Sequence, residues 1–197
     1  MKRVFTAVIV AAAVASASAA EWVVARGPQQ AAPRADIEGT WSARVRVPEK
    51  ADGQRVPQLQ LQMMIDDDEG GRNRGNWGQS VPLAAFTSLP SNLDAAQDVK
   101  FELRRDAGVV LFQGRFESGR GVGHLFFTAN REFERAMEQQ TRDTVTDREL
   151  LSFALMDVSR AFVTELQSLG YTNLREDELV DWAIHGRRLL KTRRGRL

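Results

Sequence analysis

The spacing of apolar residues changes near residue 130, and this change constrains the fold more than any other feature of the sequence. Before it, apolar and polar residues alternate, as in residues 41–47 (WSARVRV) and 58–65 (QLQLQMMI). Such alternation is typical of strands that bury one face. After it, apolar residues recur at helical spacing in residues 147–156 and 158–169. The sequence therefore predicts an α+β protein, with an N-terminal antiparallel β-sheet followed by a short α-helical module.

The sheet is expected to span residues 38–128, with about six strands. Short turns separate the alternating residues 99–104, 109–116 and 122–127, which predicts an antiparallel meander. Gly114 and Gly123 lie inside these strands, where glycine indicates a bulge or a sharp bend. Three forms stay open: a curled sheet, a small sandwich or a partial barrel.

Local signals place the helices. Thr146 and Glu149 have the spacing of a capping box, which predicts a helix over residues 147–156. Asn173 is the predicted N-cap of the last helix, with Glu176 at its third position. We expect a helical core made of residues at helix-compatible spacing: Leu150, Leu155, Phe162, Leu166, Tyr171, Leu179 and Trp182.

An internal repeat lies within the helical region. Shifted by 29 residues, residues 149–155 (ELLSFAL) align with residues 178–184 (ELVDWAI). A period of this length with two short helices is typical of a helical-hairpin repeat.

The first residues have the pattern of a secretory signal peptide. Lys2 and Arg3 precede an uncharged stretch, and small residues lead to a cleavage site expected near Ala19 or Ala20. The apolar stretch is shorter than the roughly 20 residues that a membrane helix needs, so no transmembrane segment is expected in the mature chain. We therefore expect a periplasmic or secreted protein. The chain has no cysteine, which excludes disulfides and cysteine zinc ligands.

The expected organisation has six parts. They are a signal peptide (1–20), a linker (21–37), an antiparallel β domain (38–128), a connecting helix or linker (129–145), a helical repeat module (146–190) and a basic tail (191–197).

The charge distribution argues against nucleic acid as a partner. The chain has 27 basic and 26 acidic residues, but residues 187–197 hold six cations and no acid. The body of the chain is therefore acidic, whereas nucleic-acid-binding domains carry a basic patch on the folded body. The expected partner is a protein, and the oligomeric state stays open.

Known catalytic and metal-binding patterns are missing from the sequence. His124 and His185 are its two histidines, and no H-E-x-x-H or G-x-S-x-G motif is present. The acidic segment that begins at Asp66 has Trp77 at the position where an EF-hand needs glutamate. We therefore expect no catalytic residue, cofactor or metal. Three residues are candidates for contact with a ligand or partner: Trp77, which lies in a polar glycine-rich run, Trp182 and His185.

Residues 162–186 (FVTELQSLGYTNLREDELVDWAIHG) resemble the tandem LGY…IHGV repeats of uncharacterised exported bacterial proteins. Such repeats also occur in the extracytoplasmic part of some membrane metallopeptidases of the BlaR type. Residues 99–127 are similar to the β-rich segment before those repeats. The resemblance implies an exported module without the peptidase's catalytic part. It ends after Gly186, where Arg187 and Arg188 replace the Val-Thr with which those repeats continue.

These observations favour an exported, non-enzymatic protein–protein interaction or scaffolding module of the bacterial cell envelope. One alternative is a carrier of a small hydrophobic ligand in the β domain. A second is a detached sensor or regulatory region of a membrane metallopeptidase system. In the carrier, a pocket would be lined by aromatic residues that otherwise fill the core: Trp41, Trp77, Phe86, Phe101, Phe112, Phe116, Phe126 and Phe127.

Overall fold

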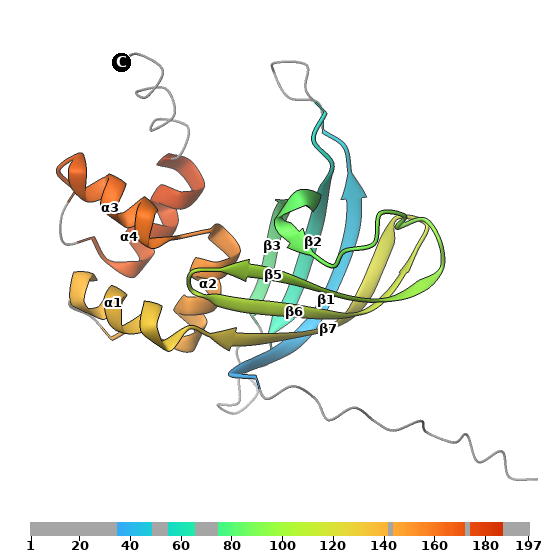
Figure 1. The fold of residues 1–197 in the computed structure, drawn as a ribbon, viewed down its shortest axis with the longest axis horizontal. Helices are drawn as coiled ribbons and strands as arrows, with labels where there is room; N and C mark the ends of the chain where they lie inside the picture. The colour runs from blue at the N-terminus through green and yellow to red at the C-terminus, as the bar shows by residue number, and fades with distance from the viewer. Residues whose placement is uncertain (1–34, 49–54, 66–74, 142–143, 172–173, 187–197) are drawn as a thin grey trace, which may run out of the picture. The chain divides into compact units, whose positions relative to one another are not determined.

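The computed structural model describes residues 35–48, 55–65, 75–141, 144–171 and 174–186, which all belong to one unit, Pro33–Leu197. They form a seven-stranded antiparallel sheet followed by helices, which confirms the predicted α+β class (Figure 1). The predictions for the signal peptide, most of the linker, the acidic segment from Asp66 and the basic tail fall outside the described residues. No helix in the described ranges is long and apolar enough to cross a membrane.

The sheet is a half-barrel in which the first strand pairs with the last. Its strands lie in the order β3-β2-β1-β7-β6-β5-β4 (Figure 1). A sandwich would need a second sheet, and the described strands form one. The strands are β1 (Ile37–Arg46), β2 (Gln58–Ile65), β3 (Gly75–Pro82), β4 (Phe86–Thr87), β5 (Gln97–Arg105), β6 (Gly108–Glu117) and β7 (Arg120–Ala129), with a 3₁₀ turn, η1 (Leu83–Ala85), before β4.

Strand β3 includes the run around Trp77, which shows no strand alternation in the sequence. This polar, glycine-rich stretch forms a strand that pairs with β2 at all eight positions. Its sequence contains two glycines and one β-branched residue, Val81, so its own propensity for strand is weak. Pairing with the strongly alternating β2 supplies the strand structure that the local sequence does not predict.

Aromatic rings fill the inner face of the half-barrel. Phe101 and Phe112 are fully buried and stack with centroids 4.9 Å apart. Trp41 meets both rings edge-on, at 5.6 and 5.9 Å. Phe86 and Phe116 complete this cluster, with ring centroids no more than 6.3 Å from their neighbours. Edge-to-face and offset contacts of this kind are favourable packing geometries. These side chains therefore form core.

Gly114 and Gly123 mark a close approach of strands. They pair with each other in an unbroken β6–β7 register, so the predicted bulge is absent and close strand contact explains the two glycines. A Cβ atom on Gly123 would lie 2.0 Å from the carbonyl oxygen of Gln113. The indole N–H of Trp41 donates to the carbonyl oxygen of His124 at 3.0 Å, which satisfies its polar group inside the core.

The helices begin directly after β7. They are α1 (Arg131–Thr141), α2 (Asp147–Met156), α3 (Arg160–Ser168), α4 (Glu176–Asp181) and a π-helical turn, η2 (Trp182–Gly186). The capping box of α2 is confirmed: the Glu149 amide donates to Thr146 Oγ1 at 3.3 Å, and the Thr146 amide donates to Glu149 Oε2 at 2.7 Å. The predicted cap of α4 is wrong by two residues. Arg175 is the N-cap, and Glu178 accepts its amide at 2.8 Å.

Sheet and helices share one hydrophobic core. Helix α2 packs on β5, β6 and β7, and Leu150, Leu151 and Phe153 are fully buried. Phe133 of α1 meets Phe153 edge-on with centroids 6.2 Å apart. The expected helical core is confirmed at Leu150, Leu155, Phe162, Leu166 and Leu179. It is wrong for Tyr171, which is 40% exposed, and Trp182 is half-buried.

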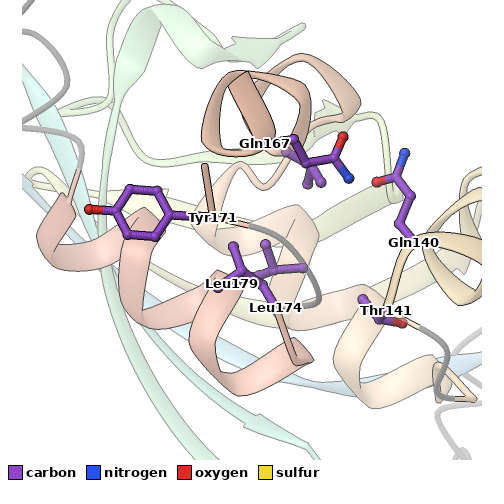
Figure 2. Close-up of a pocket in the computed structure, with 7 residues that line it drawn as sticks. Gln140, Thr141, Gln167, Tyr171, Leu174 and Leu179 are labelled. Atoms are coloured by element: carbon purple, nitrogen blue, oxygen red, sulfur yellow. The ribbon is translucent and has the colours of Figure 1, made fainter. Parts of the chain in front are cut away.

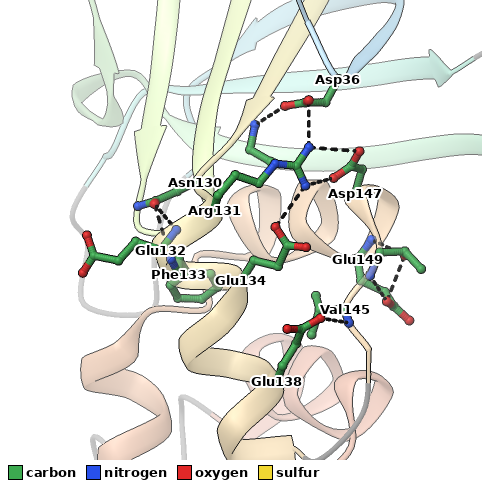
Figure 3. A network of polar contacts seen from close by, with 12 residues as sticks. Asp36, Asn130, Arg131, Glu132, Phe133, Glu134, Glu138, Val145, Asp147 and Glu149 are labelled. Atoms are coloured by element: carbon green, nitrogen blue, oxygen red, sulfur yellow. Dashed lines mark hydrogen bonds and ion pairs between the residues drawn. The ribbon is translucent and has the colours of Figure 1, made fainter.

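Arg131 joins the start of the sheet to two helices (Figure 3). Its guanidinium lies 2.8 Å from Asp36, just before β1, 3.0 Å from Glu134 on α1 and 2.6 Å from Asp147 on α2. Hydrogen bonds to Asp147, then Glu134, raise the pKa of Arg131 above its usual range. Because the side chain is about half exposed, solvent screens these ion pairs and their contribution to stability is modest.

We expect Arg131→Met to lower the free energy of unfolding by about 0.5–1 kcal/mol. Added salt should shrink this difference, because screening weakens exposed ion pairs. Urea titrations at low and high salt measure both effects. Arg135→Met, at an exposed arginine of the same helix, is the matched control. An equal loss in the two variants would contradict a specific role for Arg131.

Candidate functional site

Tyr171 and Trp182 form an aromatic pair at the end of the helical module. Their ring centroids lie 4.6 Å apart at an interplanar angle of 54°. Tyr171 follows α3, whose end is fixed by Gly170 at a φ of +92° and by a hydrogen bond from the Tyr171 amide to the Leu166 carbonyl at 3.1 Å. Trp182 is the first residue of η2. The turn after α3 and the π-helical turn η2 therefore bring the two rings together.

Gly170 is the position on which this turn depends. A left-handed conformation strains residues with a Cβ atom by about 1–2 kcal/mol, whereas glycine adopts it freely. No atom lies within 4 Å of the place where a Cβ would stand, so backbone strain is the only cost of a small side chain.

We expect Gly170→Ala to lower the free energy of unfolding by about 1 kcal/mol through backbone strain. Ser168→Ala, two residues earlier at an exposed position of α3, is the control and should change it by less than about 0.5 kcal/mol. Chemical denaturation of both variants measures the difference. If Gly170→Ala were as stable as the control, the turn would not depend on glycine.

We group the exposed and half-buried side chains of Tyr171 and of residues 181–185 under one name, the Tyr171 surface: Tyr171, Trp182, Ile184, Asp181 and His185. Ile184 is 51% exposed, whereas Leu179 and Ala183 of the same segment are buried. His185 Nδ1 lies 2.8 Å from Asp181 Oδ1, one helical turn away. Both of these side chains are well exposed, so their contact adds little stability and both are accessible to a partner.

A close approach of backbone holds Trp182 in place. A Cβ atom on Gly186 would lie 2.0 Å from the indole ring, so the ring lies directly against this glycine. The Tyr171 ring also contacts the half-buried indole, which therefore has few alternative positions. The Trp182 ring therefore packs against two neighbours, Gly186 and Tyr171.

A small pocket adjoins the surface (Figure 2). The space open to the centre of a water molecule is about 10 Å³, room for one water and not for an organic ligand. The Oε1 atom of Gln140 is buried and has no hydrogen-bond partner among the described residues. Side chains from α1, α3, α4 and the segments that follow α3 line the pocket: Gln140, Thr141, Val163, Gln167, Tyr171, Leu174 and Leu179.

The three predicted contact residues lie in two places. Trp182 and His185 share η2 and both belong to the Tyr171 surface. Trp77 lies on β3, where its half-buried ring packs partly against the core. Whether any of them touches a partner stays a prediction.

Two residues of this region escaped the sequence analysis as site residues. Tyr171 was expected in the core, and Ile184 was noted only as the last residue of the aligned repeat 178–184. The signal that could have identified Tyr171 is Gly170, because a turn after a helix moves the next residue out of helical register.

The histidines do not gather with acids into a metal site. His124 lies exposed on the outer face of β7, opposite Gln113 and Thr40. Within the ranges that the structure describes, no group of three His, Cys, Asp or Glu side chains could hold a metal ion.

No protein-family model, curated protein or solved structure matches this chain. Its function therefore has to be inferred from its own residues.

Proposed function

We propose that this chain is an exported, non-enzymatic binding protein of the bacterial cell envelope, and that its helical end contacts another protein. The observation that carries the proposal is the Tyr171 surface. There the rings of a tyrosine and a half-buried tryptophan contact each other, and an exposed isoleucine follows two residues after the tryptophan.

The composition of this patch suits a protein partner. Tyrosine and tryptophan are enriched among the residues that dominate binding energy, because they offer a large apolar area with a polar tip and few rotatable bonds. Polar neighbours such as Asp181 and His185 resemble the polar rim that surrounds such anchors. The adjoining pocket is too small to be the binding site of an organic ligand.

The inner face of the sheet gives less support to a ligand carrier. Trp41, Phe101 and Phe112 contact one another there and are buried. A ligand of similar size would have to displace these rings from a filled core. Binding on the outside of the helical end requires no such rearrangement.

The sequence supports the same role. The resemblance to repeats of exported bacterial proteins covers α3, α4 and η2, and the signal-peptide pattern agrees with export. The 29-residue offset relates α2 to α4 and η2, and α2 contacts α4. We include in the proposal that residues 146–190 act as a short helical repeat module.

Site-specific photocrosslinking in the producing cell tests the proposal. A photoreactive phenylalanine analogue replaces Tyr171 or Ile184, and Val122 on the outer face of the sheet is the control, since it is also exposed and apolar. We expect one discrete protein adduct from positions 171 and 184 and none from 122. Adducts at 122 alone, or at none of the three in folded protein, would contradict the proposal.

A further inference from the structure

One long edge of the sheet is open. Strand β3 (Gly75–Pro82) pairs with β2 on one side and stands at the end of the strand order. Among the described residues, no hydrogen bond outside the β2–β3 ladder involves β3. Since alternate residues of an edge strand direct their N–H and C=O groups away from the sheet, β3 presents a row of unpaired backbone groups.

Charged side chains, a common protection of an edge strand, are missing from β3. Strands β2 and β3 contain no charged residue in sixteen positions, eight in each. The opposite end of the sheet differs, because β4 has two residues and β5 carries outward-facing charges such as Lys100 and Arg104. Short edge strands and charged side chains are the devices that prevent pairing between molecules.

We propose that β3 pairs with β3 of a second copy of this chain, antiparallel and about a two-fold axis, to join the two half-barrels in one continuous sheet. The inference concerns a different surface from the proposed function. It explains a neutral, regular edge, because self-pairing of a strand without charge brings no like charges together. A two-fold arrangement places the same strand on both sides of the interface.

The geometry assigns Asn76–Val81 to the interface. The first residue of β3, Gly75, lies beside Arg148 of α2, since a Cβ there would be 2.7 Å from Arg148 Nη2. In an antiparallel pair, directly opposed side chains share a face. Trp77 and Val81 share one face of β3, and Asn76 and Ser80 share the other. In the joined sheet, each of these pairs therefore lies on the same face as its counterpart from the second copy. Trp77 then gains contacts from the partner strand, which gives this half-buried indole a specific role.

Sedimentation analysis of the protein purified from the producing cell tests the proposed β3–β3 pairing. A single strand pair buries a small area, so we expect a dimer that dissociates in the micromolar range. Ser80→Lys, which brings a charge to the edge, should weaken dimerisation by about tenfold or more. Ser42→Lys is the matched control, since Ser42 is an exposed serine on the outer face of the central strand β1. It should leave dimerisation unchanged.

Single cysteines give a second measurement, because the chain has none of its own. A short bismaleimide should crosslink Ser80→Cys into dimers and leave Ser42→Cys monomeric. If Ser80→Lys fails to fold, the Ser80→Cys and Ser42→Cys variants still test whether β3 pairs with β3 of a second copy. A single-chain mass at every concentration would overturn the proposal and would favour an extended peptide of another protein as the occupant of β3. A dimer that neither Ser80 variant affects or crosslinks would also overturn it.

Discussion

Phe112→Ala should lower the free energy of unfolding by about 3–5 kcal/mol, the usual cost of removing a fully buried phenylalanine. The Phe112 side chain is fully buried and its ring contacts three other rings of the inner face, those of Trp41, Phe86 and Phe101. Removal leaves a cavity at the centre of the half-barrel, and the rigid rings around it can fill that cavity only in part. Equilibrium denaturation with urea measures the loss.

Phe126→Ala is the matched control, because Phe126 lies on β7, opposite Leu111, on the other face of the same sheet and is only half-buried. This variant should lower the free energy of unfolding by about 1 kcal/mol, because the Phe126 side chain removes a smaller apolar area from water. Equal losses for the two variants would mean that the inner face is not the core.

Gly123→Val is expected to lower the free energy of unfolding by about 3 kcal/mol or more, through overpacking. The first carbon of the new side chain would lie 2.0 Å from the Gln113 carbonyl oxygen and 2.7 Å from the Cα of Gly114. Both are backbone atoms of β6, so relief requires the strands to separate. Separation would also disturb the carbonyl of His124, to which Trp41 donates.

Gly78→Ala on β3 is the control for this variant. A Cβ there would meet the far end of the Gln62 side chain at 3.1 Å, and a flexible side chain can move. We expect a change of less than about 1 kcal/mol. Thermal and urea denaturation of both variants should therefore differ clearly. A Gly123→Val protein as stable as Gly78→Ala would show that β6 and β7 can separate without cost.

Features encoded by neighbouring residues could be predicted from the sequence. Helix α2 begins and ends as expected, because Thr146 and Glu149 carry a complete capping signal within four residues. The strand at residues 58–65 also matches, since apolar and polar residues alternate from Gln58 to Met63. The cap of α4 was wrong because Asn173 and Arg175 both precede a glutamate at the correct spacing. The residue types alone did not show which of the two positions is the N-cap.

Features that depend on distant residues could not be predicted. Trp41 of β1 lies opposite Gly123 of β7, and no short-range signal specifies that pairing. Arg131 has one local partner, Glu134, and two distant ones, Asp36 and Asp147. The candidate site also combines a feature visible in the local sequence with one that depends on the fold. Trp182 was singled out as an aromatic side chain, but its contact with Tyr171 requires the turn at Gly170.

The pairing of β1 with β7 has a kinetic consequence. The two strands are separated in sequence by five other strands, so the half-barrel is assembled only after β7 has left the ribosome. Until then β1 has one unpaired side, and the ladders β1–β2–β3 and β5–β6 are separate pieces. Folding that waits for such a distant contact is slow. A chain that is still unfolded when its synthesis ends can thread through a translocation channel, so this strand order is compatible with the export that we propose.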